Sequence, residues 1–268
     1  MTKVDILLPY WGDVELLKKA VKSVLAQTEQ DWRLLVFDDC YPSKEPAKYF
    51  KKLGDDRVLY KRHAKNIGIT NNFNFSVQAA KAKYCVLFGC DDILLPNYLE
   101  TALANIGEAD FYQPNVDVID EQGNTYLPLG DKIKRLLRPR KAGVYSGQKL
   151  AASLCHGNWL YFPSILWKTA TIQRYGFDAK YSIVQDVNLE LGLIKGGGTL
   201  YLDNQTTFQY RRFAKSVSSV AKKDGKRFNE ETAVYDKFVK EFKAVGWRKA
   251  ARACQLHFTS RLHHLITR

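Results

Sequence analysis

Residues 84–96, YCVLFGCDDILLP, join an apolar segment to a pair of carboxylates. The apolar run that begins at Tyr84 leads directly into Asp91 and Asp92, and Pro96 then opens an expected helix. A continuous apolar run is typical of a buried parallel strand, and open α/β sheets bind ligands beyond the carboxyl ends of such strands. Two carboxylates there offer oxygen ligands to a Mg²⁺ or Mn²⁺ that bridges a diphosphate. A helix cap would explain Asp91 alone, but it would not explain both residues.

On either side of this segment, the first 120 residues alternate between strand and helix patterns. We expect strands at 4–9, 33–39, 58–61 and 110–119, and helices at 14–26, 43–53, 71–81 and 96–106. This alternation predicts an α/β fold with a parallel, doubly wound sheet and right-handed crossovers.

The remainder of the chain has a different pattern. Residues 130–168 are less regular, a helix is expected at 183–195, and short strands are expected at 199–203 and 207–211. From Asn229 onward apolar residues recur at helical spacing with lysines between them. We therefore expect one domain over residues 1–220 and a basic, amphipathic helical extension over residues 221–268.

The composition is that of an ordinary globular chain. Of 268 residues, 46% are hydrophobic and 26% are charged, which is typical of a soluble domain with a sizeable core. No apolar run reaches the length that crosses a bilayer, and the apolar part of the N-terminal segment is too short for a signal peptide. The five cysteines form no CxxC pair, so we expect reduced thiols in a cytosolic protein.

The net charge of +13 is concentrated in two segments. Residues 131–141 contain six Lys or Arg and one Asp, and residues 222–268 contain twelve Lys or Arg and five acids. Segregated charge suggests an anionic partner at one face, although a solvated surface is the simpler explanation.

A second acid pair, Asp38 and Asp39, ends the strand expected at 33–39. A turn would explain this pair in isolation, but its recurrence at two strand ends favours a shared site. No GxGxxG follows the first strand, and no GxxxxGK[ST] occurs in the chain. Their absence disfavours a dinucleotide-dependent oxidoreductase and a P-loop NTPase, and it favours a diphosphate site that uses a metal.

Five short motifs occur in an order and spacing that resemble the family 2 glycosyltransferases, which have the GT-A fold. The similarity covers roughly the first 220 residues. The motifs are SVLAQT at 23–28 followed by WRLLVFDD, Asn66-x-Gly68 with Asn74, AKAKYCVLFGCDD from Ala80, Gly176-Phe177-Asp178 with Gln185-Asp186, and Tyr210-Arg211-Arg212 with Ser216 and Ser218.

The resemblance implies a role for each matching residue. The donor nucleotide would contact Pro9, Tyr10, Asp38, Asp39 and Asn66, with Asp39 recognising the base. Asp91 and Asp92 would hold a divalent metal, Mn²⁺ or Mg²⁺, and Arg211, Arg212 and Ser216 would contact the diphosphate. Asp186 would be the general base of an inverting transfer, although an N-cap of the following helix also explains it.

Three positions depart from the family pattern. Gly89 replaces the first aspartate of the Asp-x-Asp-Asp metal motif, which suggests weaker metal binding. Phe213 stands where relatives often carry a histidine, and Cys40-Tyr41 replace the usual Gly-Ser after the first acid pair.

An aromatic and polar cluster precedes Pro163 and consists of His156, Asn158, Trp159 and Tyr161. Aromatic faces bind the apolar side of sugar rings, so we consider these residues candidates for the acceptor site. Packing in the core or in a lid explains the aromatic members equally well.

The basic segments favour a membrane-surface contact, because the C-terminal helices alternate apolar residues with Lys and Arg. No nucleic-acid-binding motif accompanies the charge, so we expect no nucleic acid partner. The expected protein is cytoplasmic, peripheral on the inner membrane face, and metal-dependent. It would transfer a sugar from a nucleotide-diphosphate donor to a glycan or polyprenyl-linked acceptor. A nucleotidyltransferase and a non-catalytic nucleotide- or glycan-binding protein are the alternatives.

Overall fold

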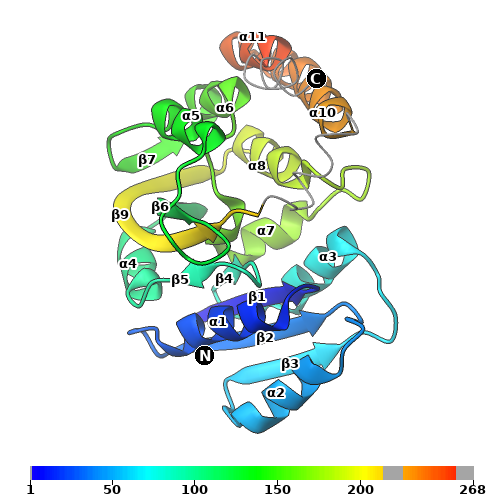
Figure 1. Cartoon of the computed structure of the whole chain (residues 1–268). Coiled ribbons are helices and arrows are strands. Elements are labelled where there is room, and N and C mark those ends of the chain that lie inside the picture. Colours follow the sequence, from blue (N-terminus) through cyan, green and yellow to red (C-terminus); the bar gives the residue numbers. More distant parts are fainter. Residues whose placement is uncertain (1, 214–225, 258–268) are drawn as a thin grey trace.

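The computed structural model describes residues 2–213 and 226–257. Within these ranges it contains one nine-stranded sheet in the order β3-β2-β1-β4-β8-β6-β9-β5, with β7 paired to β9 (Figure 1). The strands are β1 (Val4–Tyr10), β2 (Trp32–Asp38), β3 (Val58–Arg62), β4 (Tyr84–Leu87), β5 (Ile93–Leu94), β6 (Phe111–Ile119), β7 (Gly143–Ser146), β8 (Leu166–Lys168) and β9 (Thr199–Arg211).

Helices cover both faces of this sheet. They are α1 (Val14–Leu25), α2 (Glu45–Leu53), α3 (Ile69–Ala79), α4 (Tyr98–Asn105), α5 (Leu129–Leu137), α6 (Gly147–His156), the 3₁₀ helix η1 (Phe162–Ser164), α7 (Thr169–Tyr175), α8 (Gln185–Lys195), α10 (Lys226–Ala244) and α11 (Arg248–Leu256).

The N-terminal half of the sheet is parallel, as the strand and helix alternation predicts. β3, β2, β1 and β4 are neighbours, and Tyr10 of β1 lies opposite Asp38 of β2. The helix predicted to start after Asp13 does so, because that carboxylate accepts hydrogen bonds from the backbone N–H groups of Glu15 and Leu16, at 2.8 and 3.0 Å. Such a cap satisfies donors that have no partner within the helix.

The second half of the sheet is mixed. β8 is antiparallel to both β4 and β6, whereas β6 and β9 are parallel. The two short strands expected at 199–203 and 207–211 form one continuous strand, β9. The pairing of β6 with β9 shifts register between Gln113 and Val116. The polar residues in the middle of β9 suggested a break, but Asp203 there is buried and accepts hydrogen bonds from Asn105 and Tyr112, both at 2.9 Å.

Residues 130–168 are also more regular than their sequence suggests. They contain most of α5, the whole of β7, α6 and η1, and β8. Several of these elements are short, so pairing with β9 and β4 stabilises them more than their own periodicity does.

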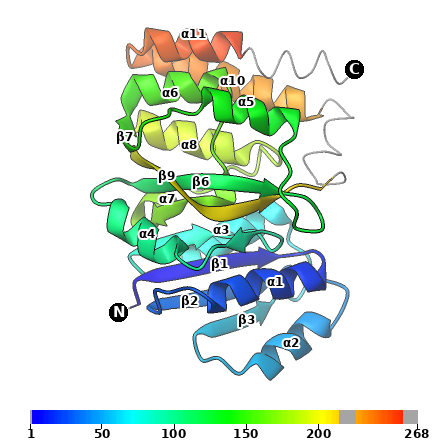
Figure 2. The same cartoon turned by 60° about the vertical axis from the view of Figure 1, so that its left-hand side comes forward.

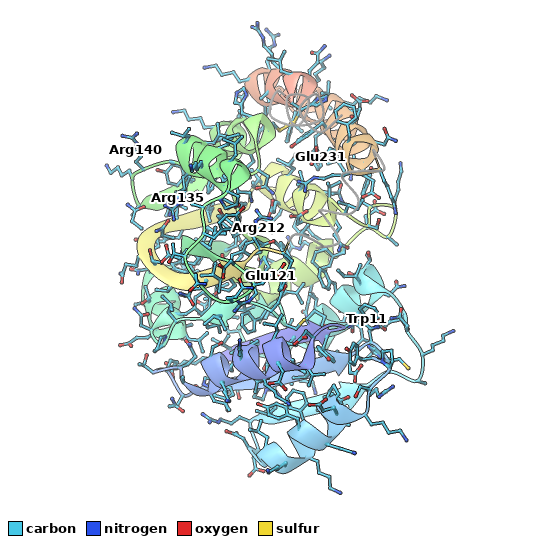
Figure 3. The ribbon with its side chains drawn as sticks, in the orientation of Figure 1. Trp11, Glu121, Arg135, Arg140, Arg212 and Glu231 are labelled. Atoms are coloured by element: carbon cyan, nitrogen blue, oxygen red, sulfur yellow. A yellow bond between two sulfur atoms is a disulfide. The ribbon has the colours of Figure 1, made fainter. Side chains whose placement is uncertain are left out.

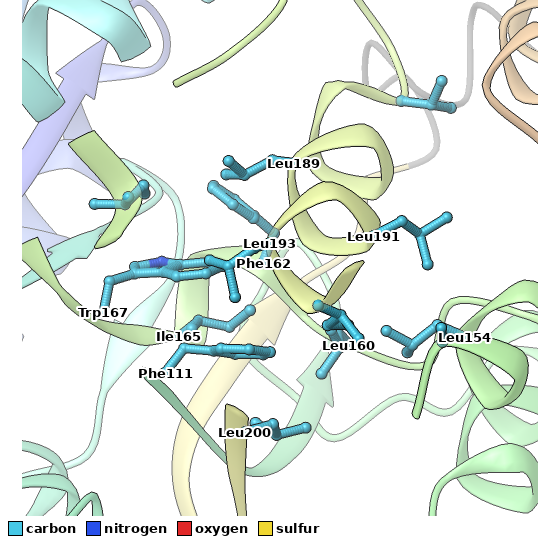
Figure 4. Packing of buried hydrophobic residues seen from close by; sticks show 14 of the residues in the cluster. Phe111, Leu154, Leu160, Phe162, Ile165, Trp167, Leu189, Leu191, Leu193 and Leu200 are labelled. Atoms are coloured by element: carbon cyan, nitrogen blue, oxygen red, sulfur yellow. The ribbon is translucent and has the colours of Figure 1, made fainter. Parts of the chain in front are cut away.

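Two hydrophobic clusters fill the space between the sheet and its helices, one on each face. Figure 4 shows part of the larger cluster, where the Phe111 and Trp167 rings stack at 5.2 Å beside Leu193 and Leu200. This cluster extends from β6 and β8 through α8 to the C-terminal helices.

The C-terminal helices α10 and α11 belong to the same folded unit as the sheet. Val234, Phe238 and Phe242 of α10 are fully buried in the larger cluster, and the Phe238 ring lies beside Gly192 of α8. Figure 2 shows α10 and α11 layered over α6 and α8. The apolar face that suggested a membrane anchor therefore packs inside the protein. Among the described residues no helix is both long and apolar enough to cross a bilayer.

The expectation of five reduced cysteines is wrong for two of them. Cys155 of α6 and Cys254 of α11 form a disulfide, whereas Cys40, Cys85 and Cys90 are free. The pair is separated by 99 residues in the sequence. Without a CxxC spacing, only the packing of α11 on α6 brings the two thiols together.

Replacing the buried Phe238 should destabilise the whole fold. We expect Phe238→Ala to lower the free energy of unfolding by about 3–5 kcal/mol, because it leaves a cavity between α10 and α8. Val245→Ala, at a residue that is 49% exposed, should change it by about 0.5 kcal/mol or less. Urea unfolding followed by circular dichroism measures both. Equal stabilities for the two variants would show that α10 unfolds independently of the sheet.

Candidate functional site

Both acid pairs lie at the same edge of the sheet. β1 runs parallel between β2 and β4, and the backbone N–H of Phe88 donates to the carbonyl of Leu7 at 2.8 Å. The loops that follow β1 and β4 meet at Gly12, where a Cβ atom would lie 3.4 Å from the Cys90 sulfur. This is the edge at which open α/β sheets bind ligands.

The first acid pair holds the surrounding loops in place. Asp38 is fully buried and accepts hydrogen bonds from the backbone N–H of Tyr41, at 2.7 Å, and from the Tyr60 hydroxyl. Asp39 accepts from the N–H groups of Ile67 and Gly68, at 2.6 and 2.9 Å. Gly68 has a φ of +83°, a conformation that favours glycine.

These contacts also explain the Asn66-x-Gly68 motif. The exposed Asn66 accepts from the N–H of Gly68 at 3.1 Å, so its side chain shapes the same loop as Asp39. A carboxylate has about four lone-pair positions, so Asp39 retains acceptor capacity toward a base.

The loop after β1 presents Trp11 rather than Tyr10. Tyr10 is fully buried and its hydroxyl donates to the Gly12 carbonyl at 2.7 Å, and Pro9 is half-buried within β1. Trp11 is 58% exposed, and its ring lies edge-on to Tyr41 with centroids 5.9 Å apart. Figure 3 shows Trp11 beyond the end of β1. An exposed indole face is suited to stacking on a nucleotide base.

In the second acid pair Asp92 is buried and Asp91 is half-buried, with the charge of Arg211 acting on both. Asp92 is 1% exposed and accepts from the N–H of Arg211 at 2.8 Å. Burial raises the pKa of Asp92 well above its usual range, and the neighbouring Asp91 charge adds to this shift. Burial also raises the pKa of Asp91. Two adjacent carboxylates repel each other when both are ionised, and a bound cation would stabilise the doubly ionised pair.

Gly89, at the position of the missing aspartate, leaves room for these carboxylates. A Cβ atom at Gly89 would lie 2.5 Å from Oδ2 of Asp92 and 3.1 Å from Oδ1 of Asp91. The described residues contain no group of three or more His, Cys, Asp or Glu side chains arranged to hold a metal. The acid pair nevertheless fits Mg²⁺ or Mn²⁺, because such ions bind through one or two carboxylates and complete their shell with water and phosphate oxygens.

Arg211 contacts backbone carbonyls. Its guanidinium donates to the carbonyls of Asp91 at 2.8 Å and of Asp120 at 2.7 Å, and the residue is 5% exposed. It therefore joins the loop of the second acid pair to the turn after β6.

Arg212, the next residue, points to a different partner. Its guanidinium donates to both carboxylate oxygens of Asp131 in α5, at 2.8 and 3.1 Å. The Tyr161 hydroxyl also donates to Asp131, at 2.8 Å. Burial raises the pKa of Asp131, but Arg212, the Tyr161 hydroxyl and the Lys134 charge together outweigh burial, and the net pKa is lowered. Figure 3 labels Arg212 near the centre of the view.

Lys134 lies one turn further along α5. Its ammonium donates to the Leu160 carbonyl at 2.6 Å and lies 4.4 Å from the centre of the Tyr161 ring. Burial, aided by the Arg212 charge, lowers the pKa of Lys134 to about 8, whereas Asp131, Asp186 and Glu190 act in the opposite direction. The Arg212 charge also lowers the pKa of Asp92. The charges of Arg212 and Lys134 therefore favour the ionised forms of Asp92 and Asp186, respectively.

Asp186 lies in the first turn of α8 and is half-buried. Burial raises its pKa, while the Val187 N–H and the Lys134 charge act in the opposite direction. Glu190, one turn later, is 1% exposed, and its pKa is raised well above the usual range by burial and by Asp186. Asn158 donates to one Glu190 oxygen at 2.8 Å, while the other oxygen has no hydrogen-bond partner among the described residues.

The segment that leads into α8 is held from two sides. The Asn74 amide donates to the Phe177 carbonyl at 2.9 Å and accepts from the Phe177 N–H at 2.8 Å. Glu230 of α10 accepts from the N–H groups of Ser182 and Ile183, at 3.0 and 2.8 Å. The C-terminal extension thus contributes to positioning Asp186.

The candidate acceptor residues other than Tyr161, whose hydroxyl donates to Asp131, occupy different environments. Trp159 is 1% exposed, its indole N–H donates to Ser153 at 3.1 Å, and its ring lies in the larger hydrophobic cluster. In this position it offers no face to a sugar. His156 is exposed at the end of α6, and Asn158 is bound to Glu190. The last diphosphate candidate, Ser216, lies outside the described residues.

Comparison with known proteins identifies the class to which this fold and site belong. A family model described as glycosyl transferase family 2 matches residues 5–170, more than half of the chain. The chain therefore belongs to glycosyl transferase family 2.

Individual relatives agree with this assignment. The chain is 26% identical over 226 residues to an uncharacterised glycosyltransferase of Rickettsia prowazekii, a match that covers 81% of this chain and 66% of the relative. It thus spans slightly less than two thirds of that relative's length.

Two solved structures share the fold. S. aureus TarS 1-349 in complex with UDP-GlcNAc has a TM-score of 0.68 at 13% identity, covering 88% of this chain and 66% of that one. The mannosyltransferase PcManGT of Pyrobaculum calidifontis, in complex with GDP-Man and Mn²⁺, has a TM-score of 0.68 at 12% identity, covering 99% and 72%. These similarities confirm the predicted GT-A fold.

Four residues of the site were not predicted from the sequence: Trp11, Asp131, Lys134 and Glu190. Trp11 is adjacent to a predicted residue, and Glu190 follows Asp186 by four positions, a spacing that places both on one helix face. Asp131 and Lys134 lie in a basic segment, and the sequence therefore suggested that they belong to a solvated surface.

The space at Gly89 gives a direct test of this arrangement. We expect Gly89→Ala to lower the free energy of unfolding by about 1–3 kcal/mol, because the new methyl group displaces the Asp92 carboxylate from the Arg211 N–H. Gly130→Ala is the matched control, since nothing lies within 4 Å of a Cβ at that position. It should be neutral or stabilising by about 0.5–1 kcal/mol. Urea unfolding measures the free energy of unfolding of both variants. Equal changes in that free energy would contradict the close packing at Gly89.

Proposed function

We propose that the chain transfers a sugar, with inversion, from a nucleotide-diphosphate donor to a hydroxyl group of a glycan or lipid-linked glycan. The observation that carries this proposal is Asp186, a half-buried carboxylate in the first turn of α8, whose preceding segment is fixed by hydrogen bonds to Asn74 and Glu230. Family membership and the nucleotide sugars bound by TarS and PcManGT support a donor of this class.

In the proposed reaction Asp186 accepts the proton of the acceptor hydroxyl. The hydroxyl oxygen forms a bond to the anomeric carbon from the face opposite the diphosphate, and the bond from that carbon to the diphosphate oxygen breaks. The electron pair leaves with the nucleoside diphosphate. A carboxylate positioned in this way contributes about 10²–10⁴-fold to the rate, and its raised pKa improves it as a base.

The donor would bind across the edge shared by β1, β2 and β4. We propose that Trp11 stacks on the base, that Asp39 and the 66–68 loop contact the nucleoside, and that Asp91 and Asp92 hold a divalent cation. A cation bound there supplies positive charge that neutralises the departing diphosphate. Arg212 adds positive charge on the same side, and Arg211 keeps the loop of the acid pair in place.

Asn158 and Glu190 are the residues we propose for acceptor contacts, since Glu190 lies one helical turn after Asp186 and Asn158 binds Glu190. A lipid-linked acceptor would bring the enzyme to the cytoplasmic face of a membrane, which the basic charge of the chain favours.

A non-catalytic nucleotide- or glycan-binding protein is the alternative that one observation favours. With Gly89 in place of an aspartate, the metal site has two carboxylates rather than three. A protein of this kind would bind nucleotide diphosphates without turnover.

Substituting Asp186 separates these two functions. We expect Asp186→Asn to lower hydrolysis or transfer of a nucleotide-diphosphate sugar by about 10²–10⁴-fold, while nucleotide diphosphates with Mn²⁺ still raise the melting temperature. Asp178→Asn, at an exposed carboxylate before α8, is the control and should retain full activity. Binding without turnover in the wild type, across a panel of donors and acceptors, would favour the non-catalytic protein.

The pH dependence tests the role of Lys134. Asp186 acts as a base only when ionised, so activity should fall as the pH drops through its raised pKa. Lys134→Met removes a positive charge that lowers this pKa, so the acidic limb of kcat against pH should move to higher pH. Lys132→Met, on the exposed side of the same helix, should leave the limb in place. A limb that does not move in Lys134→Met would exclude Lys134 as a positioning residue for Asp186.

A further inference from the structure

Helix α5 has two chemically different faces. Its inner face carries Asp131, bound to Arg212, and Lys134, bound to the Leu160 carbonyl. Its outer face carries Leu129 and Leu136, which are 65% and 79% exposed. Residues seven apart lie on the same side of a helix, so the two leucines project together.

These leucines are the two most exposed large apolar side chains in the described part of the chain. Single exposed apolar residues are common and need no explanation. Two of them on one nine-residue helix, with the exposed Lys132 between them, form a pattern typical of helices that lie in a membrane interface.

The charge around this face is strongly positive. Lys132, Arg140 and Lys141 are exposed, and in residues 2–213 and 226–257 no acidic side chain forms an ion pair with them. Arg135 lies 3.6 Å from Asp117 in an exposed ion pair. The acid of the helix itself, Asp131, is buried and neutralised by Arg212. Figure 3 shows Arg135 and Arg140 together at one corner of the molecule.

We propose that the outer face of α5, with Leu129, Lys132 and Leu136 at its centre and Arg135, Arg140 and Lys141 beside it, docks on an anionic lipid bilayer. The leucines enter the interface and the cations contact lipid phosphates. This inference rests on the proposed function, because docking through α5 would place Lys134 and Asp186 next to a lipid-linked acceptor. It assigns the membrane contact to α5, because the apolar residues of α10 are buried in the core.

Charge and apolar contact make separable contributions to such binding. Each Lys or Arg near an anionic surface strengthens binding several-fold, and buried apolar side chains add to it independently of salt. We therefore expect the interaction to require anionic lipid and to weaken as the salt concentration rises.

Vesicle sedimentation with the full chain tests this proposal. The wild type should co-sediment with vesicles of phosphatidylcholine containing phosphatidylglycerol and should remain in solution with phosphatidylcholine alone. Leu129→Ser with Leu136→Ser, and separately Lys132→Gln with Arg135→Gln, should each lower the partition coefficient on the order of tenfold. Leu256→Ser, at a 49% exposed leucine of α11, is the control and should bind like the wild type.

Two results would overturn the proposal. One is equal binding by the wild type and both double variants. The other is a dimer of the wild type, measured by sedimentation velocity, that the leucine variants abolish, since a second copy would then cover this face. Donor binding by thermal shift and hydrolysis of the donor in solution should be unchanged in the double variants. If the wild type binds vesicles but does not turn over any nucleotide-diphosphate sugar, that result would instead contradict the proposed function.

Discussion

The ion pair between Arg212 and Asp131 joins the end of β9 to α5, and the proposed catalytic half of the site depends on it. Asp131 is 1% exposed and receives a second hydrogen bond from Tyr161. Removing one partner of a buried pair leaves an uncompensated charge, which typically costs about 3–5 kcal/mol. The end of β9 and the start of α5 are therefore held together strongly, although they are 81 positions apart in the sequence.

This contact fixes the environment of Asp186 indirectly. Because α5 is held by Asp131, Lys134 stays one turn away, in a position where its charge acts on Asp186 and Glu190. The opposite side of the same segment is held by Asn74 of α3 and Glu230 of α10. Elements from the beginning, middle and end of the chain thus set the position and proton affinity of one carboxylate.

Local patterns in the sequence predicted the parts of the fold that local physics determines. The strand and helix alternation gave the parallel half of the sheet, and Asp13 marked the start of α1. The edge shared by the two acid pairs followed from the rule that parallel strands end on the same side. The unpredicted features depend on neighbours distant in sequence: the buried roles of Asp131 and Lys134, the Cys155–Cys254 bond, and the continuity of β9.

Adjacent residues at strand ends show why sequence motifs alone misplace side chains. Tyr10 is the last residue of β1 and is buried, whereas Trp11 lies beyond the strand and is exposed. Likewise Arg211 ends β9 and contacts the carbonyl of Asp91, whereas Arg212 lies beyond the strand and contacts Asp131. A motif locates such a pair correctly but does not determine which member faces the ligand.

The order of the strands also has a consequence for biosynthesis. β6 is complete at Ile119, whereas its parallel neighbour β9 begins at Thr199. At about 5–20 residues per second, a ribosome would leave that edge of β6 without its partner for several seconds. An open strand edge can recruit other chains. Pro114, in the middle of β6, has no N–H to offer such a chain, so it interrupts the row of backbone donors that β6 presents before β9 is made.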